Sequence, residues 1–275
     1  MAFQNPGDGS LDYYPCRYGT SRLLFRGPRR DVTRPYLAVL GGSETYGKFV
    51  ANPYPALIEA IAGVRVVNLG LVNAGVDAFL KDNAVQDLLV NAQMTVMQIT
   101  GAQNLTNRYY SVHPRRNDRF VTASPLLRSM FREVDFTDFH FTRHLVRHLQ
   151  TRSADRFEVV AEELRATWVR QMRALLRAVK GRAILLWVAQ QAPPAPSRRA
   201  DLESEPLIVD AEMIAAIRPL AADFVQVLPS AEARALGTQG MVLGPMDAPV
   251  AAALPNPAVH QEIASLVAAC LARHV

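Results

Sequence analysis

The stretch Tyr-Leu-Ala-Val-Leu-Gly-Gly-Ser-Glu-Thr-Tyr-Gly, residues 36–47, decides the fold class. Residues 36–40 form a short apolar run bounded by a proline and a Gly-Gly pair, which is typical of a strand buried on both faces of a parallel sheet. A helix is expected next, because Asn52 can cap it, Pro53 suits its first position and Gly63 can end it. The regular structure therefore begins as strand, loop and helix.

The same order repeats along the chain. Further apolar runs predict strands at residues 64–69, 94–100, 183–188 and 224–228. Helical patterns occupy residues 77–90, 153–181, 210–217 and 257–273. Alternating strands and helices favour a parallel sheet with right-handed crossovers. We therefore predict one α/β domain over residues 1–275, a three-layer α/β/α sandwich with a mainly parallel five-stranded sheet, carrying an irregular arm at 1–34 and a basic insertion at 105–152.

Composition narrows the class of protein. No stretch resembles a signal peptide or approaches the roughly 20 apolar residues of a membrane helix, so a cytoplasmic protein without membrane partners is expected. Cys16 and Cys270 lie at opposite ends of the chain and predict two free thiols rather than a disulfide or metal site. No strand is followed by Gly-x-Gly-x-x-Gly or a lysine-bearing phosphate loop, so no nucleotide cofactor is expected.

The positive charge is concentrated in one segment. Nine arginines and four acidic residues lie between positions 108 and 152, an excess that equals the net charge of +5 for the whole chain. Because arginine is preferred throughout the sequence, this charge alone does not predict a nucleic-acid partner. The sequence gives no indication of oligomeric state.

Ligands of doubly wound sheets bind beyond the carboxyl ends of the strands. The first strand is followed by Gly41-Gly42-Ser43-Glu44-Thr45, the second by Asn68-Leu69-Gly70 and Asn73-Ala74-Gly75, and the third by Gly101-Ala102-Gln103-Asn104. His260 stands near the start of the last helix. We expect these segments to form the functional site.

In their order, these residues resemble the motif blocks of the SGNH, or GDSL, hydrolases. The resemblance runs from about residue 36 to the C-terminus, with the basic segment as an insertion. It implies Ser43 as nucleophile, His260 as base, and an oxyanion hole made by Ser43, Gly75 (or Gly70) and Asn104. A serine hydroxyl needs such a base, and the developing oxyanion needs such donors.

The chain also departs from the family pattern at three positions. Gly42 replaces the aspartate of the first block, Gln103 holds the usual spacing of the third-block asparagine, and Pro257 replaces the acid three residues before the histidine. A triad histidine is normally oriented by an acid. Orientation would then fall to a backbone carbonyl, to Asn256 or to Asp247.

The basic insertion suggests the substrate. Arginine forks match carboxylate, sulfate or phosphate oxygens, and tyrosine faces stack on sugars or bases. The candidate substrate-binding residues are Gly42, Glu44, Thr45, Gly101, Gln103, Arg108, His113, Arg115 and Arg116. A salt-bridged surface loop is the alternative interpretation of the charged residues.

A histidine stripe, His140, His144 and His148, recurs every four residues within the insertion. Such spacing can chelate zinc, but no acidic or cysteine ligand follows at a suitable position, and Arg143 and Arg147 on the neighbouring face favour anion contact. No metal is therefore predicted.

Two functions follow from this reading. The first is an SGNH-like serine esterase or acyltransferase acting on a polar or anionic acylated small molecule or glycan. The alternative is a catalytically degenerate protein of the same fold that binds an anionic glycan, nucleotide or protein partner. The missing acid before His260 favours the alternative.

Overall fold

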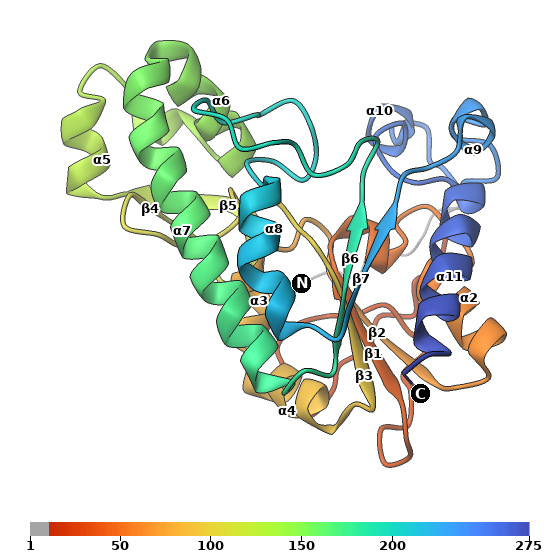
Figure 1. The fold of residues 1–275 in the computed structure, drawn as a ribbon. Coiled ribbons are helices and arrows are strands. Elements are labelled where there is room, and N and C mark those ends of the chain that lie inside the picture. Colours follow the sequence, from red (N-terminus) through yellow and green to blue (C-terminus); the bar gives the residue numbers. More distant parts are fainter. Residues whose placement is uncertain (1–10, 275) are drawn as a thin grey trace.

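The computed structural model describes residues 11–274 and shows an α/β fold with a five-stranded sheet in which every pairing is parallel (Figure 1). The strand order is β2-β1-β3-β6-β7. The strands are β1 (Leu37–Gly41), β2 (Val66–Gly70), β3 (Met94–Gln98), β6 (Ala183–Val188) and β7 (Asp223–Val227). The predicted three-layer α/β/α sandwich is confirmed.

Helices cover both faces of the sheet (Figure 1). Side chains alternate along β1, so Ala38 and Leu40 join one buried cluster and Leu37 and Val39 join the other. The first cluster includes α3 (Val76–Leu80), α4 (Asn83–Asn91), α7 (Ala154–Ala178) and α8 (Ala211–Ile217); the second includes α2 (Tyr54–Ala62) and α11 (Pro257–Leu271). Each face of the sheet thus has its own core.

Two helix predictions differ from the structure in detail. The helix expected at 77–90 is divided into α3 and α4, because Asp82 adopts an extended backbone and its side chain accepts a hydrogen bond from the Val85 N–H. Helix α2 is preceded by Pro53 as its N-cap rather than by Asn52, while Gly63 ends it with φ 67°. The periodic pattern located these helices, but the local hydrogen bonds of caps set their ends.

The basic segment, residues 105–152, forms regular secondary structure rather than an open loop. It contains the antiparallel pair β4 (Tyr110–His113) and β5 (Arg116–Ala123), then α5 (Pro125–Met130), the 3-10 turn η1 (Phe136–Asp138) and α6 (Thr142–Arg152). Tyr110, Leu127 and Leu145 are buried in the larger core cluster. Figure 1 shows this segment beside the upper part of α7, on the side of the molecule where the strands end.

The remaining elements are short: α1 (Ser43–Tyr46), the 3-10 turn η2 (Arg218–Leu220), α9 (Ala231–Ala235) and α10 (Ala248–Ala251). Residues 11–34 carry only isolated bridge pairing, between Cys16 and Phe25. Arg26 fastens this arm, donating to the carbonyl oxygens of Gly47 at 2.6 Å and Ala51 at 2.7 Å. The first ten residues of the predicted arm lie outside the described residues. Among residues 11–274, no helix has the length and apolar character needed to cross a membrane.

Candidate functional site

The sheet order places a crevice at the carboxyl end of β1. From β1 the chain passes first to β2 on one side and later to β3 on the other, and such a reversal opens a ligand site in doubly wound sheets. The segments that follow these three strands carry Ser43, Asn73 and Asn104. Hydrogen bonds to Asn73 link Ser43 and Asn104, which makes this crevice the candidate functional site.

Ser43 is the first residue of α1 and is only 6% exposed. Its hydroxyl donates to Asn73 Oδ1 at 3.1 Å, and the backbone N–H of Asn73 donates back to Ser43 Oγ at 3.1 Å. Asn73 adopts φ 55°, a left-handed conformation that asparagine tolerates better than most residues. This geometry presents both its backbone and its side chain to Ser43. Asn73 was not among the predicted site residues; its only signal in the sequence is an asparagine three residues after the end of β2.

Asn104 joins the site through Asn73 rather than through Ser43. Its Nδ2 donates to the backbone carbonyl of Asn73 at 3.1 Å, and its Oδ1 accepts from the Thr142 hydroxyl at 2.5 Å. The structure therefore brings together Ser43 and Asn104, as the sequence predicted, with Asn73 between them. Thr142 begins α6, so the same chain of contacts connects the crevice to the basic segment.

The turn that carries Ser43 is fixed from β3 by Gln98. Gln98 Oε1 accepts from the Gly42 N–H at 3.0 Å and from the Thr45 hydroxyl at 2.6 Å, while its Nε2 donates to Glu44 Oε2 at 2.9 Å. A Cβ on Gly41 would lie 2.3 Å from Gln98 Oε1, so glycine is required there. Thr45 and Glu44 were predicted to bind substrate. In the structure, their hydrogen bonds to Gln98 hold the turn in position.

Glu44 is a partly exposed carboxyl group beside Ser43. Desolvation raises the pKa of Glu44, an effect partly offset by the hydrogen bond from Gln98. Negative charge on Glu205 contributes a smaller increase. The Glu44 carboxyl is therefore more readily protonated than a surface glutamate, and it lies within electrostatic range of Glu205.

His260 is turned toward the helix interface. Its ring is 1% exposed, stacks on Tyr54 with centroids 5.8 Å apart, and accepts a hydrogen bond at Nδ1 from the Tyr54 N–H at 3.0 Å. In a neutral ring whose Nδ1 accepts, the proton is on Nε2, so neither nitrogen is free to take a proton from a serine. Desolvation lowers the pKa of His260 to about 3. Within the described residues both hydrogen bonds of the Ser43 hydroxyl go to Asn73, so this geometry does not bring the predicted base to the predicted nucleophile.

The glycine amides expected in an oxyanion hole already have acceptors. The Gly75 N–H donates to Asn117 Oδ1 at 3.0 Å, and the Gly70 N–H donates to Asn68 Oδ1 at 2.8 Å. A Cβ on Gly75 would lie 1.7 Å from the Asn104 carbonyl oxygen, so this glycine instead permits close approach of two loops. By contrast, the N–H of Ser43 has no acceptor among residues 11–274, as expected at the start of a helix.

Asn73, but not Ser43, lines a cavity of about 440 Å³. It is lined by Asn73, Gln103, Asn104, Asp118, Phe141, Thr142, Arg143, His144, Arg147 and Glu205. Asp118 Oδ2 accepts from Asn73 Nδ2 at 3.3 Å, which links one wall to the serine. Amides, carboxylates and arginines around one aromatic ring can form many hydrogen bonds, and they suit a polar ligand.

The charged residues of this wall differ from those predicted. Arg108 lies over the Tyr109 ring and near Glu163, and the backbone N–H of Arg115 donates to His113 Nδ1. Arg108, His113, Arg115 and Arg116 do not line the cavity. The arginines that line it, Arg143 and Arg147, belong to α6, which begins at the crevice.

Of the histidine stripe, His140, His144 and His148, only His144 lines the cavity. His144 lines the cavity, and its ring also packs against Phe139, with centroids 4.8 Å apart. His148 packs against the same Phe139, with centroids 5.0 Å apart, and Arg152 Nε donates to its Nε2 at 3.1 Å. Desolvation and the charge of Arg152 lower the pKa of His148. The stripe therefore contributes one member, His144, to the site.

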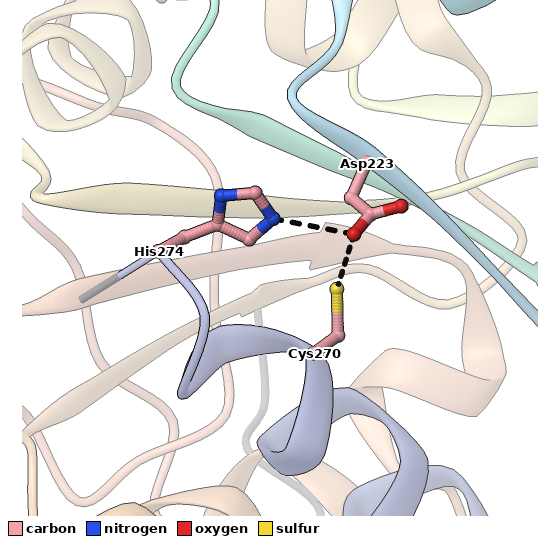
Figure 2. Close-up of side chains that lie close together, drawn as sticks. All are labelled: Asp223, Cys270 and His274. Atoms are coloured by element: carbon pink, nitrogen blue, oxygen red, sulfur yellow. Dashed lines mark hydrogen bonds and ion pairs between the residues drawn. The ribbon is translucent and has the colours of Figure 1, made fainter.

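One group of possible metal ligands lies elsewhere, at the opposite end of the sheet: Asp223, Cys270 and His274 (Figure 2). Asp223 Oδ2 accepts from Cys270 Sγ at 3.3 Å and pairs with His274 Nε2 at 3.2 Å. Arg273 also donates to this oxygen, at 2.8 Å, and Arg218 to Oδ1 at 3.3 Å. Two guanidinium groups already neutralise the carboxylate, and burial raises the pKa of Cys270 to about 11, so the cluster is better suited to anchoring the chain than to binding a cation.

Fold and site together define an α/β sandwich with a polar, arginine-bearing cavity beside a buried serine at the switch point of its sheet. The chain belongs to the family described as DUF6473, a domain of unknown function, whose model matches residues 1–275. No curated protein and no solved structure matches the chain.

Proposed function

We propose that this protein is a serine-dependent ester hydrolase or acyltransferase of SGNH type that acts on a polar, anionic acylated substrate such as a modified sugar. The observation that carries the proposal is the position of Ser43 at the carboxyl end of β1, where it is hydrogen-bonded to Asn73, a residue that lines the polar cavity. Ser43 begins the four-residue helix α1, and its own N–H, which has no acceptor among residues 11–274, can stabilise the negative charge that develops during acyl transfer.

The proposed oxyanion hole differs from the one the family resemblance implies. The Ser43 N–H is available, whereas those of Gly75 and Gly70 are occupied. Asn104 Nδ2 carries two hydrogens and donates one to Asn73, so the second can serve an oxyanion. In this proposal Ser43 and Asn104 supply the donors, and Gly75 allows the loops to meet.

The proposed base is His144 rather than His260. His144 lines the same cavity as Asn73 and Asp118, whereas Nδ1 of His260 is occupied by the backbone of Tyr54. Catalytic hydrogen bonds are often long before substrate binds, so a base on the cavity wall is compatible with this mechanism. His144 would take the hydroxyl proton of Ser43 as the acyl carbon is attacked, and return it to the leaving oxygen.

A second candidate function is ligand binding without catalysis. Two observations favour it: the occupied nitrogen of His260 and the occupied glycine amides. The cavity would then hold an anionic polyhydroxylated ligand, and Ser43 would serve only to hold Asn73, a wall residue, through their two hydrogen bonds.

The test is hydrolysis of short-chain aryl esters and acetylated sugars by the wild-type protein, Ser43→Ala and His144→Ala. We expect Ser43→Ala to reduce kcat by at least roughly 1,000-fold and His144→Ala by about 100-fold or more, because one removes the nucleophile and the other the base. Ser265→Ala, at an exposed serine of α11, is the matched control and should keep full activity. Absence of activity in the wild type, together with binding of acidic sugars, would favour the second candidate.

A further inference from the structure

The long connection after β6, residues 190–206, lies against α6 at the cavity (Figure 1). Arg143 pairs with Glu205, and Arg147 pairs with Glu203 at 3.1 Å. Arg147 also donates to the Leu202 carbonyl at 3.1 Å. The two cavity-lining arginines therefore face carboxylates of their own chain.

Glu205 is itself part of the cavity wall. Its Oε1 accepts from Arg143 and its Oε2 from the Leu207 N–H at 3.1 Å, so the carboxylate is held at the edge of the cavity in a defined orientation. The side chains of Arg143 and Glu205 are 45% and 52% exposed, and ion pairs this exposed contribute little to stability. A carboxylate from a ligand could replace that of Glu205 at small cost.

A further feature of the same cavity points to a ligand. Helix α6 begins at the cavity without a side-chain cap, and the N–H groups of Arg143 and His144 in its first turn have no acceptor among residues 11–274. Gln103 lines the cavity at 6% exposure, but its Oε1, which has no hydrogen-bond partner in the described part of the chain, is buried against Gly101. Free helix N–H groups beside the Arg143 guanidinium favour an anionic ligand.

We propose that Arg143 and the start of α6 form a subsite for a carboxylate of the substrate, and that Glu205 occupies this subsite when substrate is absent. That the ligand of this subsite is a substrate rests on the proposed function. The subsite narrows the substrate class to acyl compounds that carry a carboxylate, such as acylated uronic acids. Residues 190–206 thereby act as an internal competitor that the substrate displaces.

The experiment compares binding of methyl glucuronide and methyl glucoside, which differ by a carboxylate and a hydroxymethyl group, using isothermal titration calorimetry. We expect Glu205→Gln to tighten glucuronide binding by about 2- to 5-fold, because it removes a competing ion pair. Arg143→Gln should weaken glucuronide binding by roughly 10- to 100-fold. Neither change should alter binding of the neutral glucoside by as much as 2-fold.

Arg156 and Glu133 provide matched controls, because they form a similarly exposed ion pair between α7 and the basic segment but do not line the cavity. Arg156→Gln and Glu133→Gln should leave glucuronide binding unchanged. The inference is overturned if Glu205→Gln weakens glucuronide binding, leaves it unchanged, or tightens binding of both sugars equally. The probes contain no ester, so the result does not depend on Ser43: failure of ester hydrolysis with a positive Glu205→Gln result would remove the proposed catalysis and keep the subsite.

Discussion

Ser43 and Asn73 form a reciprocal hydrogen-bonded pair, and this pair organises the site at the scale of single residues. Asn73 can make both contacts because it adopts a left-handed backbone, and its Nδ2 extends the chain of contacts to Asp118. An amide cannot remove the serine proton at neutral pH, so the pair orients the hydroxyl without activating it. Activation must come from a group on the cavity wall.

His260 has a structural role that can be tested through pH. Its pKa is lowered to about 3 in the folded protein, against about 6.5 when unfolded, so the unfolded chain binds the additional proton between these values. The stability that neutral His260 contributes is complete above pH 6.5 and is lost as the pH falls toward 3. This one group should lower the free energy of unfolding by about 2 kcal/mol between pH 6.5 and 5.

The measurement is urea unfolding of the wild type and His260→Asn at pH 7 and pH 5. Asparagine can keep an acceptor near the position of Nδ1 but does not titrate, so we expect a distinctly smaller loss of stability at pH 5 in the variant. Equal losses in the two proteins would show that His260 is accessible to protons in the folded state and would restore it as a candidate base.

At the scale of elements, the end of α11 is anchored to the start of β7 through Asp223 (Figure 2). Hydrogen bonds from Arg273, the Phe224 N–H and His274 hold the pKa of Asp223 well below its usual range. The corresponding stability is present above the unfolded pKa of about 3.9 and is lost as the pH falls below it.

Asp223→Asn should lower the free energy of unfolding by about 1 kcal/mol at pH 7, and the difference from wild type should shrink below pH 4. Urea unfolding measures both values. Asp87→Asn, at an exposed carboxylate on α4 with no ion pair in the described residues, should have little effect. A marked rise in melting temperature with one equivalent of Zn²⁺ would contradict the anchoring role and identify a metal site.

Helix ends were the features of elements hardest to predict. Apolar spacing over residues 77–90 continues across Asp82, so the pattern gave no break, whereas the cap formed by its carboxylate starts a new helix there. The basic segment posed the opposite difficulty: its many charges suggested a solvated loop, but buried residues such as Tyr110 and Leu145 pack it onto the body. The segment has few apolar residues among its many charges, but these are enough to pack it against the core.

At the scale of the whole molecule, the sequence predicts the architecture well because buried parallel strands leave continuous apolar runs. It also predicted that Ser43, Asn104 and Gln103 would lie at the same edge of the sheet, since residues that follow parallel strands gather there. It could not find Asn73, Arg143 or Glu205, because their places depend on a backbone conformation and on the packing of two insertions. Such contacts between distant segments leave no periodic signal.

Covalent labelling of Ser43 tests the central claim most directly. The protein is incubated with a fluorophosphonate, which reacts with serines made nucleophilic by their surroundings, and the adduct is located by peptide mass spectrometry. The serine-enzyme account predicts one adduct per chain, on Ser43, and its loss in Ser43→Ala. An unmodified wild-type protein, or labelling that persists in Ser43→Ala, would contradict it.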